Sequence, residues 1–135
     1  MSDKAILAQL KNVPLFSQTT ARQRKNIARI GKTVTWSAGS TPIEQGSEAV
    51  AFFLILDGRV EVVRDGTTVA QLGPGRFVGE IALLTGDLRT ADANALSDST
   101  VFALGRSAFS RAIKADPAMA LVLLSALDER QAAFS

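Results

Sequence analysis

A succession of short runs rich in β-branched and aromatic residues fills residues 32–104 and limits the fold more than any other feature of the chain. The runs are TVTW, AFFLIL, RVEVVR, TTVAQL, TADANAL and STVFAL, and turn residues separate them. Many short strands at close spacing are typical of a β-sandwich or barrel. Val60 and Val62 share one face of the RVEVVR strand, so the Val62 side chain is predicted to point inward.

Two Asp-Gly pairs lie between expected strands, at Asp57-Gly58 and Asp65-Gly66. Both central residues of a tight two-residue hairpin have positive φ, and Asp-Gly is among the pairs that adopt this conformation. We therefore predict a tight hairpin at each pair.

Helices are expected before the strands. Apolar residues at helical spacing predict a first helix between Ser2 and Pro14, and a second helix is expected from about Thr20 to Gly31. The second helix carries four basic residues on its outer side, namely Arg22, Arg24, Lys25 and Arg29. We interpret this side as a solvated face rather than a nucleic-acid surface, because no aromatic residue or second reading element accompanies it.

Helices are also expected after the strands. One is predicted near Ser107, and a last helix is predicted to have Asp116 as its cap and Pro117 at its first position. Residues 118–124 are apolar on every side, unlike the one-sided pattern of a surface helix. We therefore expect something beyond the barrel to cover the second face, either a dimer partner or a movable docking position.

Size and composition favour one domain. The chain has 135 residues, of which 47% are hydrophobic, enough to bury a core. We expect N-terminal helices over residues 1–31, a β-barrel over 32–106 and C-terminal helices over 107–135. The first residues mix acid and base, and no apolar run approaches the about 20 residues that span a bilayer. These features favour a cytoplasmic protein.

The chain contains no cysteine and no histidine. Disulfides, thiolate nucleophiles and the commonest metal ligand and general base are therefore excluded, and we expect neither a metal nor a catalytic site. The net charge is +2, from 15 basic and 13 acidic residues. So narrow an excess gives little reason to expect nucleic acid as a partner.

One stretch, GRFVGEIALLTGDLRTA at residues 75–91, combines a glycine-rich turn, one glutamate and an arginine followed by a hydroxyl. If Gly79 to Leu84 form a short helix, its first N–H groups and Arg89 would together hold a phosphate. Glu80 would repel a phosphate but would accept a hydrogen bond from a neighbouring sugar hydroxyl. A ligand that carries both groups close together is a nucleotide, and one compact enough for this stretch is a cyclic nucleotide.

The run FVGEIALLTGDLRTA resembles the phosphate-binding cassette of the cyclic nucleotide-binding domain family, which is found in the catabolite activator protein, the regulatory subunit of protein kinase A and cyclic nucleotide-gated channels. AGSTPIEQGSEAVAFFLILDGRVEVV is similar to the early barrel strands of that family, VAQLGPGRFVGE to its entry into the cassette, and LKNVPLF to its N-terminal helical lead. The resemblance covers nearly the whole chain. It implies a mainly β fold, a jelly-roll barrel with flanking helices.

The resemblance also implies roles for single residues. Glu80 would accept the ribose 2′-hydroxyl, and Arg89 would hold the exocyclic phosphate oxygens. The full set of implied ligand contacts is Gly79, Glu80, Ile81, Ala82, Arg89, Thr90 and Ala91. The residues implied to flank the base or to close over it as a lid are Val62, Ala70, Leu72, Arg130 and Phe134. For the three barrel residues among these, plain core packing is the alternative.

The function that the resemblance implies is that of a sensor for a cyclic nucleotide. Thr90 is compatible with either purine, and we favour cAMP over cGMP as the ligand. Binding would draw the cassette inward and reposition the C-terminal helix, which would signal to a protein partner or a second copy of the chain. No direct contact with nucleic acid is expected.

Two other functions compete with this one. The first is a degenerate jelly-roll interaction module that binds no nucleotide, although the presence of both Glu80 and Arg89 argues against it. The second is a cupin-like metal enzyme, which would need a cluster of histidines that the chain lacks.

Overall fold

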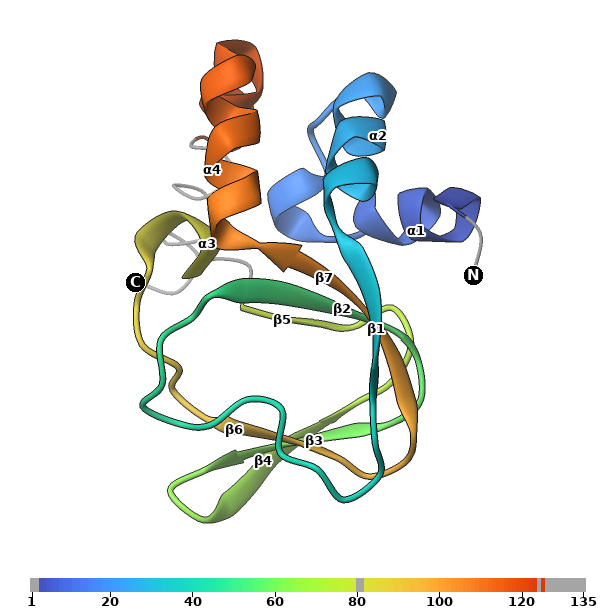
Figure 1. Cartoon of the computed structure of the whole chain (residues 1–135), viewed down its shortest axis with the longest axis vertical. Helices are drawn as coiled ribbons and strands as arrows, with labels where there is room; N and C mark the ends of the chain where they lie inside the picture. The colour runs from blue at the N-terminus through green and yellow to red at the C-terminus, as the bar shows by residue number, and fades with distance from the viewer. Residues whose placement is uncertain (1–2, 80–81, 124, 126–135) are drawn as a thin grey trace.

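The computed structural model describes residues 3–79, 82–123 and 125. Figure 1 shows a β-barrel whose two sheets lie one above the other, with the helices gathered over one of them. In chain order the elements are α1 (Asp3–Leu10), the 3₁₀ helix η1 (Pro14–Phe16), α2 (Ala21–Ile30), β1 (Lys32–Trp36), β2 (Ala51–Asp57), β3 (Val60–Arg64), β4 (Thr67–Leu72), β5 (Phe77–Val78), α3 (Ala82–Thr85), β6 (Asp92–Ala95), β7 (Ser99–Gly105) and α4 (Arg106–Ala115). Residues 117–123 form a further helical segment.

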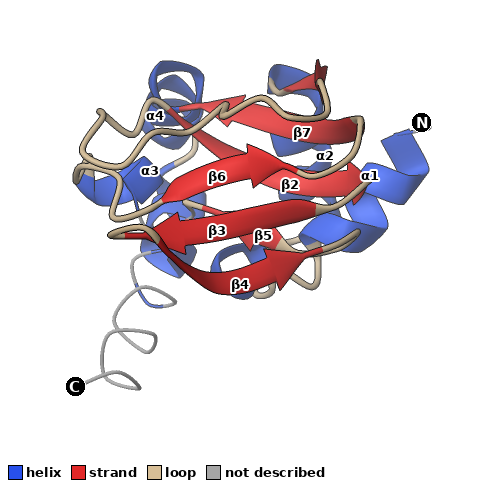
Figure 2. Cartoon of the chain, turned by 90° about the horizontal axis from the view of Figure 1, so that it is seen from below, coloured by secondary structure: helices blue, strands red, loops and turns tan. Residues whose placement is uncertain are grey.

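Two antiparallel sheets form the barrel. The first has the strand order β1-β7-β2-β5 and faces the helices, and the second has the order β4-β3-β6 and lies on the far side (Figures 1 and 2). In the second sheet Val62 pairs with Ala70 on one side and with Ala93 on the other. The predicted mainly β architecture with flanking helices is thus confirmed.

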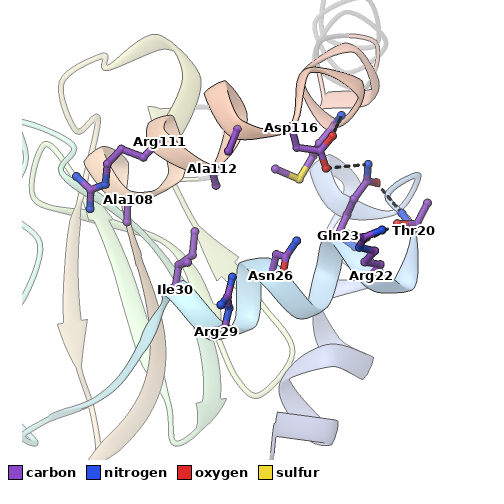
Figure 3. A pocket seen from close by; sticks show the side chains of 12 residues that line it. Thr20, Arg22, Gln23, Asn26, Arg29, Ile30, Ala108, Arg111, Ala112 and Asp116 are labelled. Atoms are coloured by element: carbon purple, nitrogen blue, oxygen red, sulfur yellow. Dashed lines mark hydrogen bonds between the residues drawn. The ribbon is translucent and has the colours of Figure 1, made fainter.

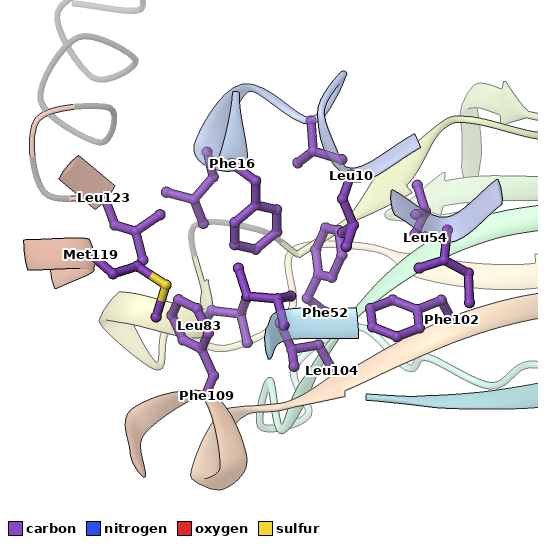
Figure 4. Close-up of a cluster of buried hydrophobic side chains, with 14 of the residues drawn as sticks. Leu10, Phe16, Phe52, Leu54, Leu83, Phe102, Leu104, Phe109, Met119 and Leu123 are labelled. Atoms are coloured by element: carbon purple, nitrogen blue, oxygen red, sulfur yellow. The ribbon is translucent and has the colours of Figure 1, made fainter. Parts of the chain in front are cut away.

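Strand β2 separates two hydrophobic cores because its side chains alternate between the faces of the first sheet. Phe52 and Leu54 face the helices, whereas Ile55 belongs to the cluster between the two sheets. Figure 4 shows the helix-side core, where the Phe16 ring centroid lies 5.6 Å from that of Phe52 and 6.1 Å from that of Phe109, both in edge-to-face geometry. The helices are therefore fixed to the sheet by aromatic packing.

Side-chain caps confirm the predicted starts of α2 and of the last helical segment, whereas the predicted cap Ser2 lies outside the described residues. The Thr20 hydroxyl accepts a hydrogen bond from the Gln23 N–H (3.1 Å), and the Gln23 side chain accepts one from the Thr20 N–H (2.8 Å), which together make a capping box. At the last helix the Asp116 carboxylate accepts from the Met119 N–H at 3.2 Å. Met119 is buried against the core, but Leu121 is 69% exposed, so one apolar face of this segment points outward.

Some predictions about turns need correction. Asp65-Gly66 does form a tight hairpin between β3 and β4, with φ of 52° and 79° at its two residues. The hairpin predicted at Asp57-Gly58 is wrong, because β2 and β3 do not pair: β2 pairs with β5 and β7. Here the chain crosses between the sheets, and only Gly58 has a positive φ (104°).

Two further details differ from the sequence analysis. Strand β5, only two residues long, is too short to give a periodic pattern. The short helix after it is described from Ala82 to Thr85, whereas Gly79 lies before it with a left-handed φ of 83°. A helix cannot begin at a residue with this φ, so the predicted range of Gly79 to Leu84 is wrong at its start.

Candidate ligand-binding site

A cavity of about 410 Å³ lies between the second sheet and the loop that follows α3. This volume falls within the about 300–1,000 Å³ that is usual for small-molecule sites. The residues that line it are Ile43, Val62, Arg64, Phe77, Val78, Gly79, Thr85, Asp87, Leu88, Arg89, Thr90, Ala91, Asp92 and Ala93. The structure thus brings the end of β5 and residues 87–91, two parts of the predicted cassette, to one wall.

Arg89 is held in place through its backbone and its side chain. Its N–H donates to the Ser47 carbonyl and its carbonyl accepts from the Gly46 N–H, both at 2.8 Å. Its Nη2 donates to the Ala51 carbonyl at the start of β2. The guanidinium carbon also lies 5.8 Å from the ring centroid of Phe53. The side chain is therefore positioned before any ligand arrives.

Arg89 is a buried charged residue, with only 9% of its surface exposed. This burial lowers the pKa of Arg89 from its ordinary value, because a low-dielectric surrounding disfavours the charged form. Among the described residues no carboxylate forms an ion pair with it. A desolvated cation beside a cavity favours an anionic ligand, above all one that accepts two hydrogen bonds from the guanidinium fork.

Gly79 forms the part of the cavity wall closest to this guanidinium. Its φ is 83°, and a Cβ added here would overlap Arg89 Nη1 and lie 3.1 Å from Arg89 Cζ. Glycine adopts this backbone conformation without strain, and because it has no Cβ it leaves room for the guanidinium. The position of the Arg89 guanidinium therefore depends on a glycine at position 79.

Other residues predicted for the site lie at or beside the cavity. Thr90 is exposed and Ala91 half-buried, and both line it, as does Val62 from β3. Ala70 and Leu72 do not line the cavity and instead pack with the cluster between the sheets. Their assignment as residues that flank a base remains a prediction, with core packing as its alternative.

Several predicted residues lie outside the described part of the chain. These are Glu80 and Ile81 in the cassette and Arg130 and Phe134 near the C-terminus. Ala82 is described as the first residue of α3. The roles implied for all of them remain predictions.

Three charged residues line the cavity that were not predicted from the sequence. Arg64 is exposed at the end of β3, two residues after Val62 and therefore on the same face of the strand. The alternation of side chains along a strand could have predicted its place from that of Val62. Asp87 lies in the loop after α3, whereas Asp92 begins β6 beside β3, and the Asp92 carboxylate accepts a hydrogen bond from the Gln45 N–H at 2.6 Å. The cavity thus combines these charged side chains with the apolar side chains of Val62 on β3 and of Phe77 and Val78 on β5.

The described residues contain neither a metal site nor a membrane-spanning helix. No group of three acidic side chains there is placed to hold a metal ion. Within the same residues no helix has the length and apolar character that crossing a membrane requires.

Sequence comparison relates this chain to one protein family. A family model described as a cyclic nucleotide-binding domain matches residues 33–116. The cAMP-dependent protein kinase regulatory subunit of Schizosaccharomyces pombe is 36% identical over 103 residues, which are 76% of this chain and 25% of that protein. The corresponding subunit of Aspergillus fumigatus is 37% identical over 106 residues, 77% of this chain and 26% of that protein. The chain thus spans about a quarter of the length of these relatives.

Solved structures share the fold. The N-terminal domain of a transcriptional regulator from Streptomyces coelicolor superimposes with a TM-score of 0.86 at 26% identity, over 94% of each chain. A cyclic nucleotide-binding-like protein from Brucella abortus superimposes with a TM-score of 0.75, also at 26% identity, over 81% of this chain and 97% of that one. The predicted jelly-roll arrangement is confirmed by these likenesses.

Proposed function

Because the chain belongs to the cyclic nucleotide-binding domain family, we propose that it reversibly binds a cyclic nucleotide in the cavity beside Arg89, with cAMP preferred and cGMP as the alternative. The preference for cAMP is supported by the relatives, which are named as regulatory subunits of a cAMP-dependent kinase. The proposed role is regulatory, and it contains no catalytic step.

The observation that carries the proposal is the buried guanidinium of Arg89. A cyclic phosphate has one negative charge and two free oxygens, which match the charge and the fork of a guanidinium. Part of the cost of desolvating Arg89 is already met in the folded protein, which strengthens its interaction with a bound phosphate. Gly79 allows the ligand and the guanidinium to approach the backbone closely.

The remaining contacts are proposed from the family resemblance. Glu80 would accept a hydrogen bond from the ribose 2′-hydroxyl, and Thr90 would lie between phosphate and base. Val62 supplies an apolar wall on the side of the cavity formed by β3, where a purine would pack. Arg130 and Phe134 are proposed to close over the base.

Signal transmission is proposed to run from the cassette to the C-terminal helices. Leu83 of α3 belongs to the same buried cluster as Phe109 of α4 and as Met119 and Leu123 in the following helical segment. A ligand that moves α3 would therefore alter the packing of α4 and of the helical segment after it. A protein partner or a second copy of the chain that distinguishes the two positions would read the signal.

Thermal unfolding with added nucleotide tests the proposal. We expect cAMP at about one hundred times its dissociation constant to stabilise the chain by about 2.7 kcal/mol, which raises the melting temperature by several degrees. The effect of cGMP should be smaller, and that of linear 5′-AMP smaller still. If none of the three nucleotides raises the melting temperature, the result would instead support the jelly-roll interaction module that binds no nucleotide.

A further inference from the structure

A second cavity, larger than the one beside Arg89, lies between α2 and α4 and has a volume of about 930 Å³. Figure 3 shows the two helices facing each other, with Ile30 and Ala112 pointing into the space between them. None of the residues that line this cavity lines the cavity beside Arg89. We call it the α2–α4 groove; the residues that line it are Thr20, Arg22, Gln23, Asn26, Arg29, Ile30, Ala108, Arg111, Ala112, Ala115, Asp116 and Met119.

The two helices that form the groove concentrate positive charge. Residues 21–30 and 106–116 contain 7 of the 15 basic residues of the chain and 1 of its 13 acidic residues, a net charge of +6. The remaining residues contain 8 basic and 12 acidic side chains, a net charge of −4. A narrow overall excess therefore hides a strongly basic end of the molecule.

Three of these cations line the groove and have no acidic partner among the described residues. Arg22, Arg29 and Arg111 are exposed, and no described carboxylate forms an ion pair with any of them. The one acid at the groove, Asp116, is engaged with Gln23 Nε2 (3.5 Å) and with the Met119 N–H (3.2 Å). The three arginines can therefore take acidic partners.

The floor of the groove is apolar. Ile30 and Ala112 are half-buried and pack against the helix-side core, while Met119 is buried within it. The groove thus has a rim of arginines around a hollow apolar strip. Duplex nucleic acid and a lipid surface would both meet the rim, but neither would fill the hollow with side chains.

From this geometry we propose that the α2–α4 groove binds an acidic amphipathic helix of a partner protein. Apolar side chains of that helix fill the strip along Ile30 and Ala112, and its carboxylates pair with Arg22, Arg29 and Arg111. Two of the four basic residues of α2, Arg22 and Arg29, then belong to a recognition surface and not to the solvated face predicted from the sequence. The site stands apart from the nucleotide cavity, so the inference goes beyond the proposed sensor function and does not depend on it.

The test uses the 135-residue chain and a fluorescein-labelled helical peptide of about 18 residues, with leucines on one face and glutamates on the other. Fluorescence anisotropy should show saturable binding that weakens as salt is added. A peptide of the same composition in scrambled order, and one with lysine in place of glutamate, should bind at least about tenfold more weakly.

The double variant Arg22→Glu and Arg111→Glu reverses the charge on both sides of the groove. Arg22 is in the first turn of α2, where an acid suits the helix dipole, so the fold should be kept. We expect its affinity for the acidic peptide to fall at least about tenfold. The matched control, Arg59→Glu with Arg76→Glu, changes exposed arginines at barrel turns and should bind as the unaltered chain does.

Three results would overturn the proposal. One is equal binding of the peptide by the charge-reversed variant and the unaltered chain. Another is that duplex DNA or phosphatidylserine vesicles bind more tightly than the peptide and that the charge-reversed variant loses this binding. That result would assign the groove to another class of partner. The third is self-association of the chain that the same variant abolishes.

Discussion

Replacing Arg89 with leucine is expected to weaken cAMP binding at least about a hundredfold, which corresponds to about 3 kcal/mol. Leucine fills a similar space but leaves the phosphate without a charged partner inside a site from which water has been displaced. Arg89→Lys should recover only part of the loss, because an ammonium keeps the charge but not the fork that binds two oxygens. Isothermal titration with cAMP measures all three affinities.

The same substitution should do little to the stability of the chain without ligand. Arg89→Leu removes the hydrogen bond to the Ala51 carbonyl and the contact with the Phe53 ring, but it also removes a buried charge. These effects oppose each other, so we expect the free energy of unfolding to change by within about 1 kcal/mol. Denaturant unfolding measures it, with Arg76→Leu, at an exposed turn residue, as the control. A variant that loses its fold would show that Arg89 serves the barrel rather than the ligand.

Replacing Gly79 with alanine is expected to impair both stability and binding. Its φ of 83° costs an alanine about 1–2 kcal/mol, and the added Cβ overlaps Arg89 Nη1. The guanidinium must move, so cAMP affinity should fall at least about tenfold, since displacing a positioned group by a fraction of an ångström weakens its hydrogen bonds.

Gly75 provides a matched control for this substitution. Its φ is 88°, close to that of Gly79, but nothing lies within 4 Å of an added Cβ. Gly75→Ala should therefore lose similar stability and keep its affinity for cAMP. In the Arg89→Leu background, Gly79→Ala should cost little further affinity, because the side chain that it displaces is gone. Equal losses of affinity in Gly75→Ala and Gly79→Ala would show that backbone strain, and not Arg89, explains the effect.

Several elements of the fold could be predicted from local sequence. Thr20 marks the start of α2 through a capping box that involves only Gln23, three residues along the chain. The Asp65-Gly66 hairpin is likewise local, because its two residues supply the positive φ that the turn requires. Features of this kind need no knowledge of tertiary contacts.

Tertiary arrangement explains what the sequence did not reveal. Asp57-Gly58 consists of the same two residue types as the true hairpin. However, β2 before it belongs to one sheet and β3 after it to the other, and only long-range strand pairing decides this. The partners of Arg89 are also distant in sequence: the Ala51 carbonyl and the Phe53 ring are 38 and 36 residues away. Chemistry could suggest a phosphate at Arg89, but not that its guanidinium would be desolvated.

The α2–α4 groove illustrates the same limit. Each helix alone has a basic outer side that a solvated face explains adequately. Only their packing side by side, with arginines around an apolar strip, gives a concave surface. The inference of a partner therefore depends on the fold and could not have been made from either helix.

A crystal structure of the chain with cAMP tests the central claim most directly. We expect the cyclic phosphate within hydrogen-bonding distance of the Arg89 guanidinium, beside the backbone of Gly79, and the purine against Val62. Nucleotide bound in the α2–α4 groove, or bound beside the second sheet with its phosphate turned away from Arg89, would contradict the account.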